Sequence, residues 1–270
     1  MALTWVKMRK QKKRSTMFDN MIDIHSHSLW GLDDGSRSFD ETLDMCFCAE
    51  DNGTGNLFVT PHLMYWEMAE NLYDKREEKV QLLEESLDEQ GSSLIIKKGF
   101  EILCDDDIFV IKHFKPYTLN GSRYVLIEFD FRKTTEEDVT SWCNYLKSFG
   151  LVPVIAHPER YGFVLDDVTC INRLSDNGVL FQINAGSPAG AFGEGEMRVS
   201  CNMINCGFVD FIGSDAHRIN MRNTNMAFSI EGYPESVDMD VIRKAALVNP
   251  KAILNDSEYI PERKKYITKL

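Results

Sequence analysis

Seven short runs of apolar and β-branched residues recur along the chain, each followed by a turn or a helix-like segment. They lie at residues 21–24, 57–60, 94–97, 124–127, 152–156, 179–184 and 209–213. Apolar residues are continuous within most of these runs, which is typical of strands that are buried on both faces of a parallel sheet. Strands that alternate with helices are joined by crossovers, so the order of the runs predicts an α/β protein with a parallel sheet.

Helical patterns fill several of the intervals between these runs. Ser38-Phe-Asp-Glu41 is predicted to be a capping box, and residues 67–90 form a long, charged helix pattern. Thr135 opens another helix that runs towards Gly150, and residues 171–178 and 197–207 each precede a strand. Seven units without an internal linker favour one closed or nearly closed barrel. A doubly wound open sheet is the alternative, although no strand is followed by a nucleotide-binding glycine motif.

Side chains that bind metals follow almost every predicted strand. Five of the six histidines stand at such ends, and only His113 does not. The carboxyl ends of barrel strands form one face, where active sites of parallel barrels lie. We therefore expect one metal site built from His25, His27, His62, Glu101, Glu128, His157, Asp215 and His217.

Spacing supports this interpretation. Residues i and i+2 of a strand point to the same side, so His25 and His27 can chelate one cation, and Asp215 and His217 are placed in the same way. Imidazole and carboxylate ligands suit zinc, manganese or iron. Each residue alone has a simpler explanation: a single histidine is usually a surface or hydrogen-bonded residue, and Glu128 in its apolar run could form a structural salt bridge.

Two arginines and one turn extend the candidate site. Arg160 follows His157 by three residues, and Arg222 follows His217 by five. Guanidinium groups grip phosphate oxygens bidentately, although Arg222 alone could equally form a surface salt bridge. Asp34, in the turn at residues 32–35, adds a carboxylate beyond the first strand; ordinary Asp-Gly turn chemistry is the alternative.

Composition narrows the class of protein. The net charge of −12 disfavours a nucleic-acid substrate, because an acidic surface repels phosphates. No apolar run reaches membrane-spanning length, so no transmembrane segment is expected. Seven cysteines form no CxxC pair, which indicates reduced thiols and a cytoplasmic location.

Residues 1–20 differ from the rest of the chain. Residues 7–14 are rich in Lys and Arg. We interpret the segment as a flexible tail ahead of a single domain at residues 21–270. A weak electrostatic contact with an anionic membrane or an acidic partner is the alternative hypothesis.

Eight motifs occur in an order that resembles the polymerase-and-histidinol-phosphatase (PHP) superfamily. Within it, they are similar to the bacterial capsule-associated, manganese-dependent protein-tyrosine phosphatases. The motifs span roughly residues 21–240 and read Met21-Ile-Asp-Ile-His-Ser-His27, Gly31-Leu-Asp-Asp-Gly35, Val59-Thr-Pro-His62, Gly99-Phe-Glu101, Leu126-Ile-Glu128, Ala156-His-Pro-Glu-Arg-Tyr161, Gln182-Ile-Asn-Ala-Gly-Ser187 and Gly213-Ser-Asp-Ala-His217.

The resemblance implies a distorted (β/α)7 TIM-like barrel with three divalent cations, usually Mn2+, with iron and zinc as alternatives. One cation would be held by His25, His27, Glu101 and Asp215, a second by Glu101, Glu128 and His157, and the third by Asp34, His62 and His217. Arg160 and Arg222 match positions implicated in phosphate binding. The implied substrate is a tyrosine-phosphorylated protein, in this family a bacterial autokinase that controls capsule or exopolysaccharide assembly.

The implied reaction is phosphotyrosine hydrolysis by a hydroxide that bridges two cations, with Asp34 or a metal-bound water assisting the leaving group and no role for cysteine. Three other functions remain open. They are a phosphatase of a small metabolite resembling histidinol phosphate, a C–N hydrolase of the amidohydrolase type and a non-catalytic metal-binding or partner-binding module. The oligomeric state is also open, a homo-oligomer included.

Overall fold

The structure, a computed structural model, describes residues 18–268 and has an α/β architecture in which every strand pair is parallel. A sheet of three strands has the order β1 (Met21–Asp23), β2 (Thr54–Val59), β4 (Ile95–Lys98). A second sheet has the order β3 (His62–Leu63), β5 (Glu101–Leu103), β6 (Tyr124–Glu128), β7 (Val152–Ala156), β8 (Leu180–Asn184), β9 (Phe211–Gly213). Each of the seven predicted runs contains a strand, so the parallel α/β prediction is confirmed.

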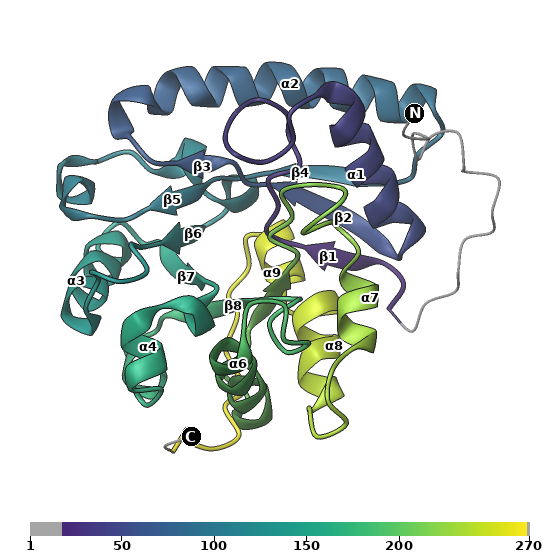
Figure 1. Ribbon diagram of the computed structural model, residues 1–270. Coiled ribbons are helices and arrows are strands. Elements are labelled where there is room, and N and C mark those ends of the chain that lie inside the picture. The colour runs from purple at the N-terminus through teal and green to yellow at the C-terminus, as the bar shows by residue number, and fades with distance from the viewer. Residues whose placement is uncertain (1–17, 269–270) are drawn as a thin grey trace.

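Most helices lie around the outside of the strands, whereas α9 lies in the middle of the view, within the ring that the strands form (Figure 1). The helices are α1 (Phe39–Asp51), α2 (Ala69–Glu89), α3 (Glu136–Lys147), α4 (Gly162–Asp166), α5 (Cys170–Asp176), α6 (Glu194–Cys206), α7 (Met226–Glu231), α8 (Met239–Leu247) and α9 (Lys251–Leu254). Short 3-10 turns are η2 (Trp66–Met68), η3 (Asp106–Val110), η4 (Lys115–Tyr117), η5 (Leu119–Gly121) and η6 (Pro158–Arg160). The sequence patterns indicated α1, α2, α3, α5 and α6 but gave no signal for α4 or for α7 to α9.

A capping box was predicted at the N-terminus of α1, but the structure has the complete box at α3. At α3, the Thr135 hydroxyl accepts from the Asp138 N–H, and the Asp138 carboxylate accepts from the Thr135 N–H. At α1, Ser38 accepts from the Glu41 N–H, but the Glu41 carboxylate accepts from the Arg37 N–H instead of from Ser38. The predicted hydrogen bond from the Ser38 N–H to the Glu41 carboxylate was therefore wrong, because that carboxylate accepts from the N–H of the residue before Ser38.

Two of the predicted strands are each followed, after a short interruption, by a second strand that the sequence did not indicate. The chain leaves β2 at Val59 and resumes as β3 at His62, and it leaves β4 at Lys98 and resumes as β5 at Glu101. Gly99 allows the second interruption, since a Cβ atom there would lie 2.7 Å from the Leu119 side chain. The Glu101 N–H donates to the Pro61 carbonyl at 3.2 Å, so the two segments stay side by side across the interruptions.

The first and last strands meet at their carboxyl ends. Ser26 and Ala216 form a parallel bridge. The His27 N–H donates to the Ala216 carbonyl and the Asp215 N–H to the His25 carbonyl, both at 2.8 Å. These bonds bring together the two segments that the sequence predicted to hold ligands at opposite ends of the strand order.

The two faces of the strands pack against different partners. Alternate residues such as Val125, Ile155 and Phe181 join the large core cluster with the outer helices. Their neighbours, among them Leu126 and Val154, form a second cluster that includes Ala252 and Ile253 of α9. Burial on both faces explains why the strand sequences are continuously apolar.

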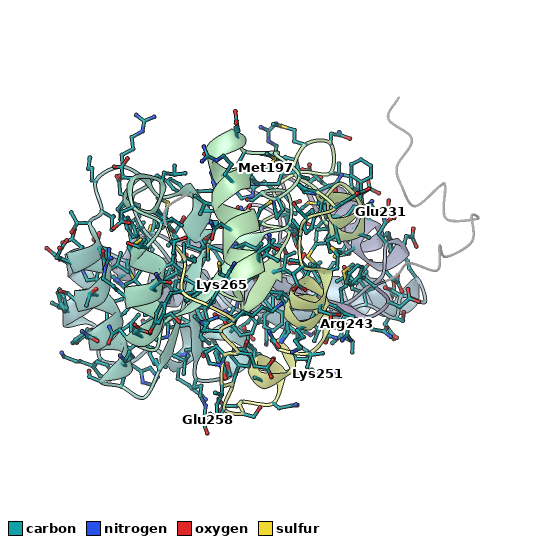
Figure 2. All side chains as sticks on the ribbon, turned by 90° about the horizontal axis from the view of Figure 1, so that it is seen from below. Met197, Glu231, Arg243, Lys251, Glu258 and Lys265 are labelled. Carbon is teal, nitrogen blue, oxygen red and sulfur yellow. The ribbon has the colours of Figure 1, made fainter. Side chains whose placement is uncertain are left out.

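The C-terminal segment lies against α6 and α8. Figure 2 shows Lys265 beside α6, where the Lys264 and Lys265 N–H groups both approach the Cys206 carbonyl. One residue before Lys264, the Arg263 guanidinium donates two hydrogen bonds to the buried Asp210 carboxylate, from Nη1 to Oδ1 at 2.8 Å and from Nη2 to Oδ2 at 3.0 Å. These contacts hold the C-terminal segment against α6 and against the residue before β9.

At the other end, Phe18 is buried in the large cluster. The predicted basic tail lies, for residues 1–17, outside the residues that the structure describes. Within residues 18–268, no helix has both the length and the apolar character needed to cross a membrane.

Candidate metal centre

All nine residues that the sequence analysis proposed as ligands lie at one end of the strands. Their ligand atoms form four overlapping groups, each within 4.8 Å, and the groups share His25, His27, His62 and Glu101. His25, Glu101, His157 and Asp215 are almost fully buried, whereas Asp34 is exposed. The arrangement is therefore a buried cluster that opens to solvent on one side.

Glu101, the first residue of β5, is at the centre of the cluster. Its Oε2 atom lies 3.2 Å from both His25 Nε2 and His27 Nε2, and its Oε1 atom lies 2.9 Å from His157 Nε2. Asp215 Oδ1 lies 3.6 Å from His25 Nε2 and 3.4 Å from His27 Nε2. One carboxylate thus contacts three imidazoles from two strand ends, those of β1 and β7.

A second group joins β3 to β5 and β6. His62 Nδ1 lies 3.1 Å from Glu101 Oε2 and 2.7 Å from Glu128 Oε1. The predicted grouping of Glu101, Glu128 and His157 differs from this arrangement, because His62 is the imidazole that contacts both carboxylates. His157 is instead grouped with His25 and Asp215.

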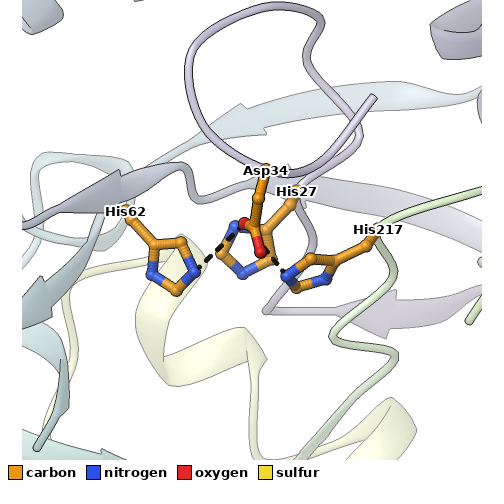
Figure 3. Close-up of side chains that lie close together, drawn as sticks. All are labelled: His27, Asp34, His62 and His217. Carbon is orange, nitrogen blue, oxygen red and sulfur yellow. Dashed lines mark ion pairs between the residues drawn. The ribbon is translucent and has the colours of Figure 1, made fainter. Parts of the chain in front are cut away.

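The third group is the open side of the cluster (Figure 3). Asp34 Oδ1 lies 3.5 Å from His62 Nε2 and 3.4 Å from His217 Nε2. The His27 ring lies between the two, with ring centroids 4.3 Å from His62 and 4.2 Å from His217. The side chain of Asp34 is 71% exposed, so this group is the one that a solvent molecule reaches first.

Two of these residues have a left-handed backbone. The φ angle is +36° at His157 and +48° at Asp215. This conformation is uncommon in residues other than glycine and persists where the surrounding structure fixes it. Here the His157 N–H donates to the Gln182 carbonyl at 2.7 Å, and the Asp215 N–H donates to the His25 carbonyl. Both turns direct the side chain back over the strand ends.

Asp33 contacts two of the candidate ligand residues, one through its imidazole and one through its backbone, a role that the sequence analysis missed. Its Oδ2 atom accepts from His27 Nδ1 at 2.7 Å and from the His62 backbone N–H at 3.0 Å. The turn is tight, because a Cβ atom on Gly35 would lie 2.0 Å from the His27 carbonyl oxygen. The sequence offered two adjacent carboxylates in this turn, and only the structure separates their roles.

Two amides of β8 hold further members of the cluster. Gln182 Oε1 lies 2.8 Å from His25 Nδ1, and Asn184 donates to Asp215 Oδ2 at 2.7 Å. A hydrogen bond to the second ring nitrogen fixes which nitrogen of a histidine faces a metal. Both amides belong to the motif at residues 182–187 that the sequence analysis noted, but their spacing alone did not indicate a role in the site.

Charge within the cluster shifts the pKa values of its carboxyl groups. Burial alone would raise the pKa of Asp33, but the His27 charge and hydrogen bonds from His27 and the backbone lower it to about 2. Burial likewise acts against ionisation of Glu101 and Asp215. The neighbouring His25 charge and hydrogen bonds from other histidines outweigh burial, so both pKa values lie below their usual range.

Several buried ligand atoms approach one another without forming hydrogen bonds. Within residues 18–268, Glu101 Oε2, His62 Nδ1 and His157 Nδ1 have no hydrogen-bond partner. Glu101 Oε2 and His62 Nδ1 are nevertheless only 3.1 Å apart. Buried polar atoms rarely stay unpaired. Donor atoms that converge in this way fit a shared cation, and the imidazole and carboxylate types suit manganese, iron or zinc.

Arg160 and Arg222 lie beside the cluster, as the sequence analysis expected. Arg222 Nη1 is 3.0 Å and Arg160 Nη1 3.5 Å from Asp215 Oδ2. The Arg160 guanidinium lies between two aromatic rings, 4.6 Å from the Phe131 centroid and 4.8 Å from the Phe192 centroid. Both side chains remain partly exposed, at 25% and 29%. They can therefore meet an anion that enters the open side.

The seven cysteines take no part in the cluster. All seven are free, and six are buried. Burial raises the pKa of each thiol, for example to about 12 at Cys46 and Cys143. A nucleophilic cysteine needs a lowered pKa, so this observation agrees with a site that does not use thiolate chemistry.

Comparison with known proteins identifies relatives over most of the chain. Residues 21–255 match the family described as capsular polysaccharide synthesis, CpsB/CapC. A Staphylococcus aureus protein named CapC is 31% identical over 75% of this chain and 79% of its own length. The tyrosine-protein phosphatase YwqE of Bacillus subtilis is 30% identical over 75% of this chain and 80% of its own.

Two further comparisons extend over more of the chain. The tyrosine-protein phosphatase CpsB of Streptococcus pneumoniae is 28% identical over 87% of this chain and 99% of its own length. A crystal structure from work on YwqE and CpsB, described as metal-dependent tyrosine phosphatases, superposes with a TM-score of 0.73. It covers 92% of this chain and all of the other at 24% identity, which establishes a shared fold.

Proposed function

The chain belongs to the CpsB/CapC capsular polysaccharide synthesis family, and we propose that it is a metal-dependent protein-tyrosine phosphatase. The observation that supports this function best is the convergence of nine histidine and carboxylate side chains from six of the seven strand positions. The proposal includes a role in capsular or exopolysaccharide synthesis, in keeping with the names of the relatives.

The proposed cofactor is Mn2+, with three cations and with iron or zinc as alternatives. The four overlapping groups support a multinuclear site, because neighbouring groups share Glu101 and His62. His25, His27, Glu101 and Asp215 would hold one cation. Glu101, Glu128, His157 and His62 surround the second position, and Asp34, His62 and His217 the third. Divalent cations would acidify a coordinated water and polarise the phosphate oxygens.

The side chains around the cluster would bind and orient the substrate. Arg160 and Arg222 would grip the phosphate, because guanidinium groups match its oxygens and stabilise negative charge that develops during hydrolysis. Contact with Asp215 holds both arginines over the buried end of the site. Asp34, on the open side, is the proposed group that assists departure of the phenolate.

Several finer statements belong to the same proposal. The substrate would be a bacterial tyrosine autokinase, and the location the cytoplasm, where free thiols such as the seven found here stay reduced. The fold would be a distorted (β/α)7 barrel. Counting β2 with β3 and β4 with β5 gives seven strand positions, and the Ser26–Ala216 bridge supports closure.

The test is hydrolysis of a phosphotyrosine peptide by the full chain, before and after removal of metal with a chelator and after Mn2+ is restored. Activity should disappear and return. Glu101→Gln should lower metal affinity and activity by about 100-fold or more, because ligand groups control both. Glu84→Gln, on the exposed face of α2, is the matched control.

Two results would contradict the proposal. One is turnover that persists in chelated, folded protein, and the other is faster turnover of a metabolite such as histidinol phosphate than of the peptide. Elemental analysis of the purified protein identifies the metals and their number independently of activity.

A further inference from the structure

A pocket of about 770 Å3 adjoins the candidate metal centre. It lies between the loop that follows β8 and the segment that leads from β9 into α7, and residues from 185–192 and 214–229 line it. This pocket, hereafter the side pocket, holds none of the buried carboxylates of the cluster. Among the candidate ligands only His217 lines it, so most of the side pocket is free for a role other than metal binding.

The side pocket has an unusual composition for this chain. The sequence has 42 acidic residues against 30 basic ones. The lining nevertheless includes Arg218 and Arg222 and no carboxylate. Its apolar part comes from Phe192, Met221, Met226 and Phe228. Met221 and Phe228 are 84% and 73% exposed, so large apolar groups face solvent beside two guanidinium groups, which pair with Glu41 and Asp215 outside the lining.

Two residues connect the side pocket to the candidate metal centre. His217 and Arg222 line the pocket, and each also contacts the cluster. Phe192 lies at the boundary, with its ring centroid 4.8 Å from the Arg160 guanidinium carbon and 5.7 Å from that of Arg222. A phosphate held by both arginines would therefore have Phe192 and the pocket beside it.

We propose that the side pocket binds the aryl ring of the phosphorylated substrate and so selects phenolic over aliphatic phosphate esters. The inference rests on the proposed phosphatase function. An aromatic ring gains edge or stacking contacts with Phe192 and sulfur contacts with the methionines, which a short alkyl group does not make. The absence of carboxylates from the lining suits a ring that carries a dianionic phosphate.

The test compares two ligands with the same charged head. The Mn2+-loaded full chain is titrated with phenylphosphonate and with methylphosphonate in a calorimeter. We expect phenylphosphonate to bind about tenfold or more tightly, as apolar pockets distinguish such groups. Phe192→Ala should reduce this ratio by about tenfold, and Met221→Ala by about two- to tenfold.

Because the test uses the ratio of the two affinities, it separates binding of the aryl ring from indirect effects on binding of the charged head. Phe192→Ala could displace Arg160 or Arg222, but both ligands would lose that interaction equally. Met68→Ala is the matched control, since Met68 is an exposed methionine that does not line the side pocket. It should keep the wild-type ratio.

Equal binding of the two phosphonates by the wild type would overturn the subsite. Variants of Phe192 and Met221 that keep the wild-type affinity ratio would overturn it as well. Hydrolysis of a phosphotyrosine peptide is measured in parallel. Hydrolysis together with equal phosphonate binding rejects the subsite and leaves the phosphatase function standing. Absence of hydrolysis rejects the function, and the subsite with it.

Discussion

Asp33 and Asp34 are adjacent in sequence but occupy different places in the site. Asp33 accepts hydrogen bonds from His27 Nδ1 and from the His62 backbone N–H. Asp34 points to the open side, within 3.5 Å of His62 and His217. One turn thus provides a candidate ligand and the group that orients two other ligands.

Asp33→Asn should weaken metal binding by about 10- to 100-fold, because it removes the charge that orients His27. Calorimetric titration of the chelated protein with Mn2+ measures the effect. Asp40→Asn, at an exposed position of α1, should bind Mn2+ as the wild type does. Wild-type affinity in Asp33→Asn would show that the His27 ring is held by packing alone.

Arg222→Lys should lower kcat/KM for a phosphotyrosine peptide by about 100-fold, as loss of a charged donor at a reacting group does in other enzymes. A lysine ammonium cannot reproduce the forked contacts of Arg222 with Asp215 and His217. Arg243→Lys, on the exposed face of α8, serves as the control. Equal kinetics for the two variants would exclude Arg222 from phosphate binding.

Strand ends were more predictable than the residues that support them. His25, His27 and Asp215 stood out because metal-binding side chains repeat after apolar runs, and burial forces such runs into strands. Gln182 and Asn184 did not stand out, because an amide in a strand has no distinctive spacing. The grouping of His62 with Glu128 depends on how neighbouring strands are staggered, which no local pattern encodes.

At the scale of elements, the predictable helices are those with charged faces or caps. The short helices α4, α7 and α9 gave no periodic signal, because four to six residues span barely more than one turn. Helix α1 has a different character, since its residues Cys46, Phe47, Cys48 and Ala49 are all buried. Its two thiols therefore sit in the core between the strands and the neighbouring helices.

The thiol of Cys46 should make stability fall at alkaline pH. Burial, with a smaller effect of the Glu50 carboxylate, raises its pKa from 9.0 to about 12. The contribution of the neutral Cys46 thiol to the unfolding free energy is complete below pH 9. It is lost as pH rises towards 12, because only the unfolded state releases the thiol proton in that range. Between pH 8 and 10 the wild type should lose about 1.4 kcal/mol more unfolding free energy than Cys46→Ala.

Urea unfolding at the two pH values measures this difference. The comparison with Cys46→Ala removes the effects of lysines and tyrosines, which both proteins share. Parallel loss of stability in the two proteins would mean that Cys46 ionises as readily in the folded state as in the unfolded state.

At the scale of the molecule, the candidate metal centre joins segments from six of the seven strand positions. Its ligands come from residues 25 to 217, and the Ser26–Ala216 bridge connects the first strand to the last. Metal bound here would interact with the folded chain and hardly at all with the unfolded one. Binding free energy then adds directly to folding free energy.

Mn2+ at 100 times its dissociation constant should raise the unfolding free energy by about 2.7 kcal/mol per site. Thermal unfolding of chelated and Mn2+-loaded protein tests this, with Mg2+ as the comparison because it disfavours imidazole ligands. Glu101→Gln should show little change in melting temperature when Mn2+ is added. The same increase in that variant would place the stabilising ion elsewhere.

The bridge between the first and last strands also sets an order of events during synthesis. His25 and His27 leave the ribosome early, whereas Asp215 and His217 leave it only after most of the chain has been made. Contacts between such distant segments form slowly, because a long loop must close first. We expect a nascent chain to carry four of its five histidine ligands exposed until the final strand arrives, so that the enzyme becomes competent only when its fold is complete.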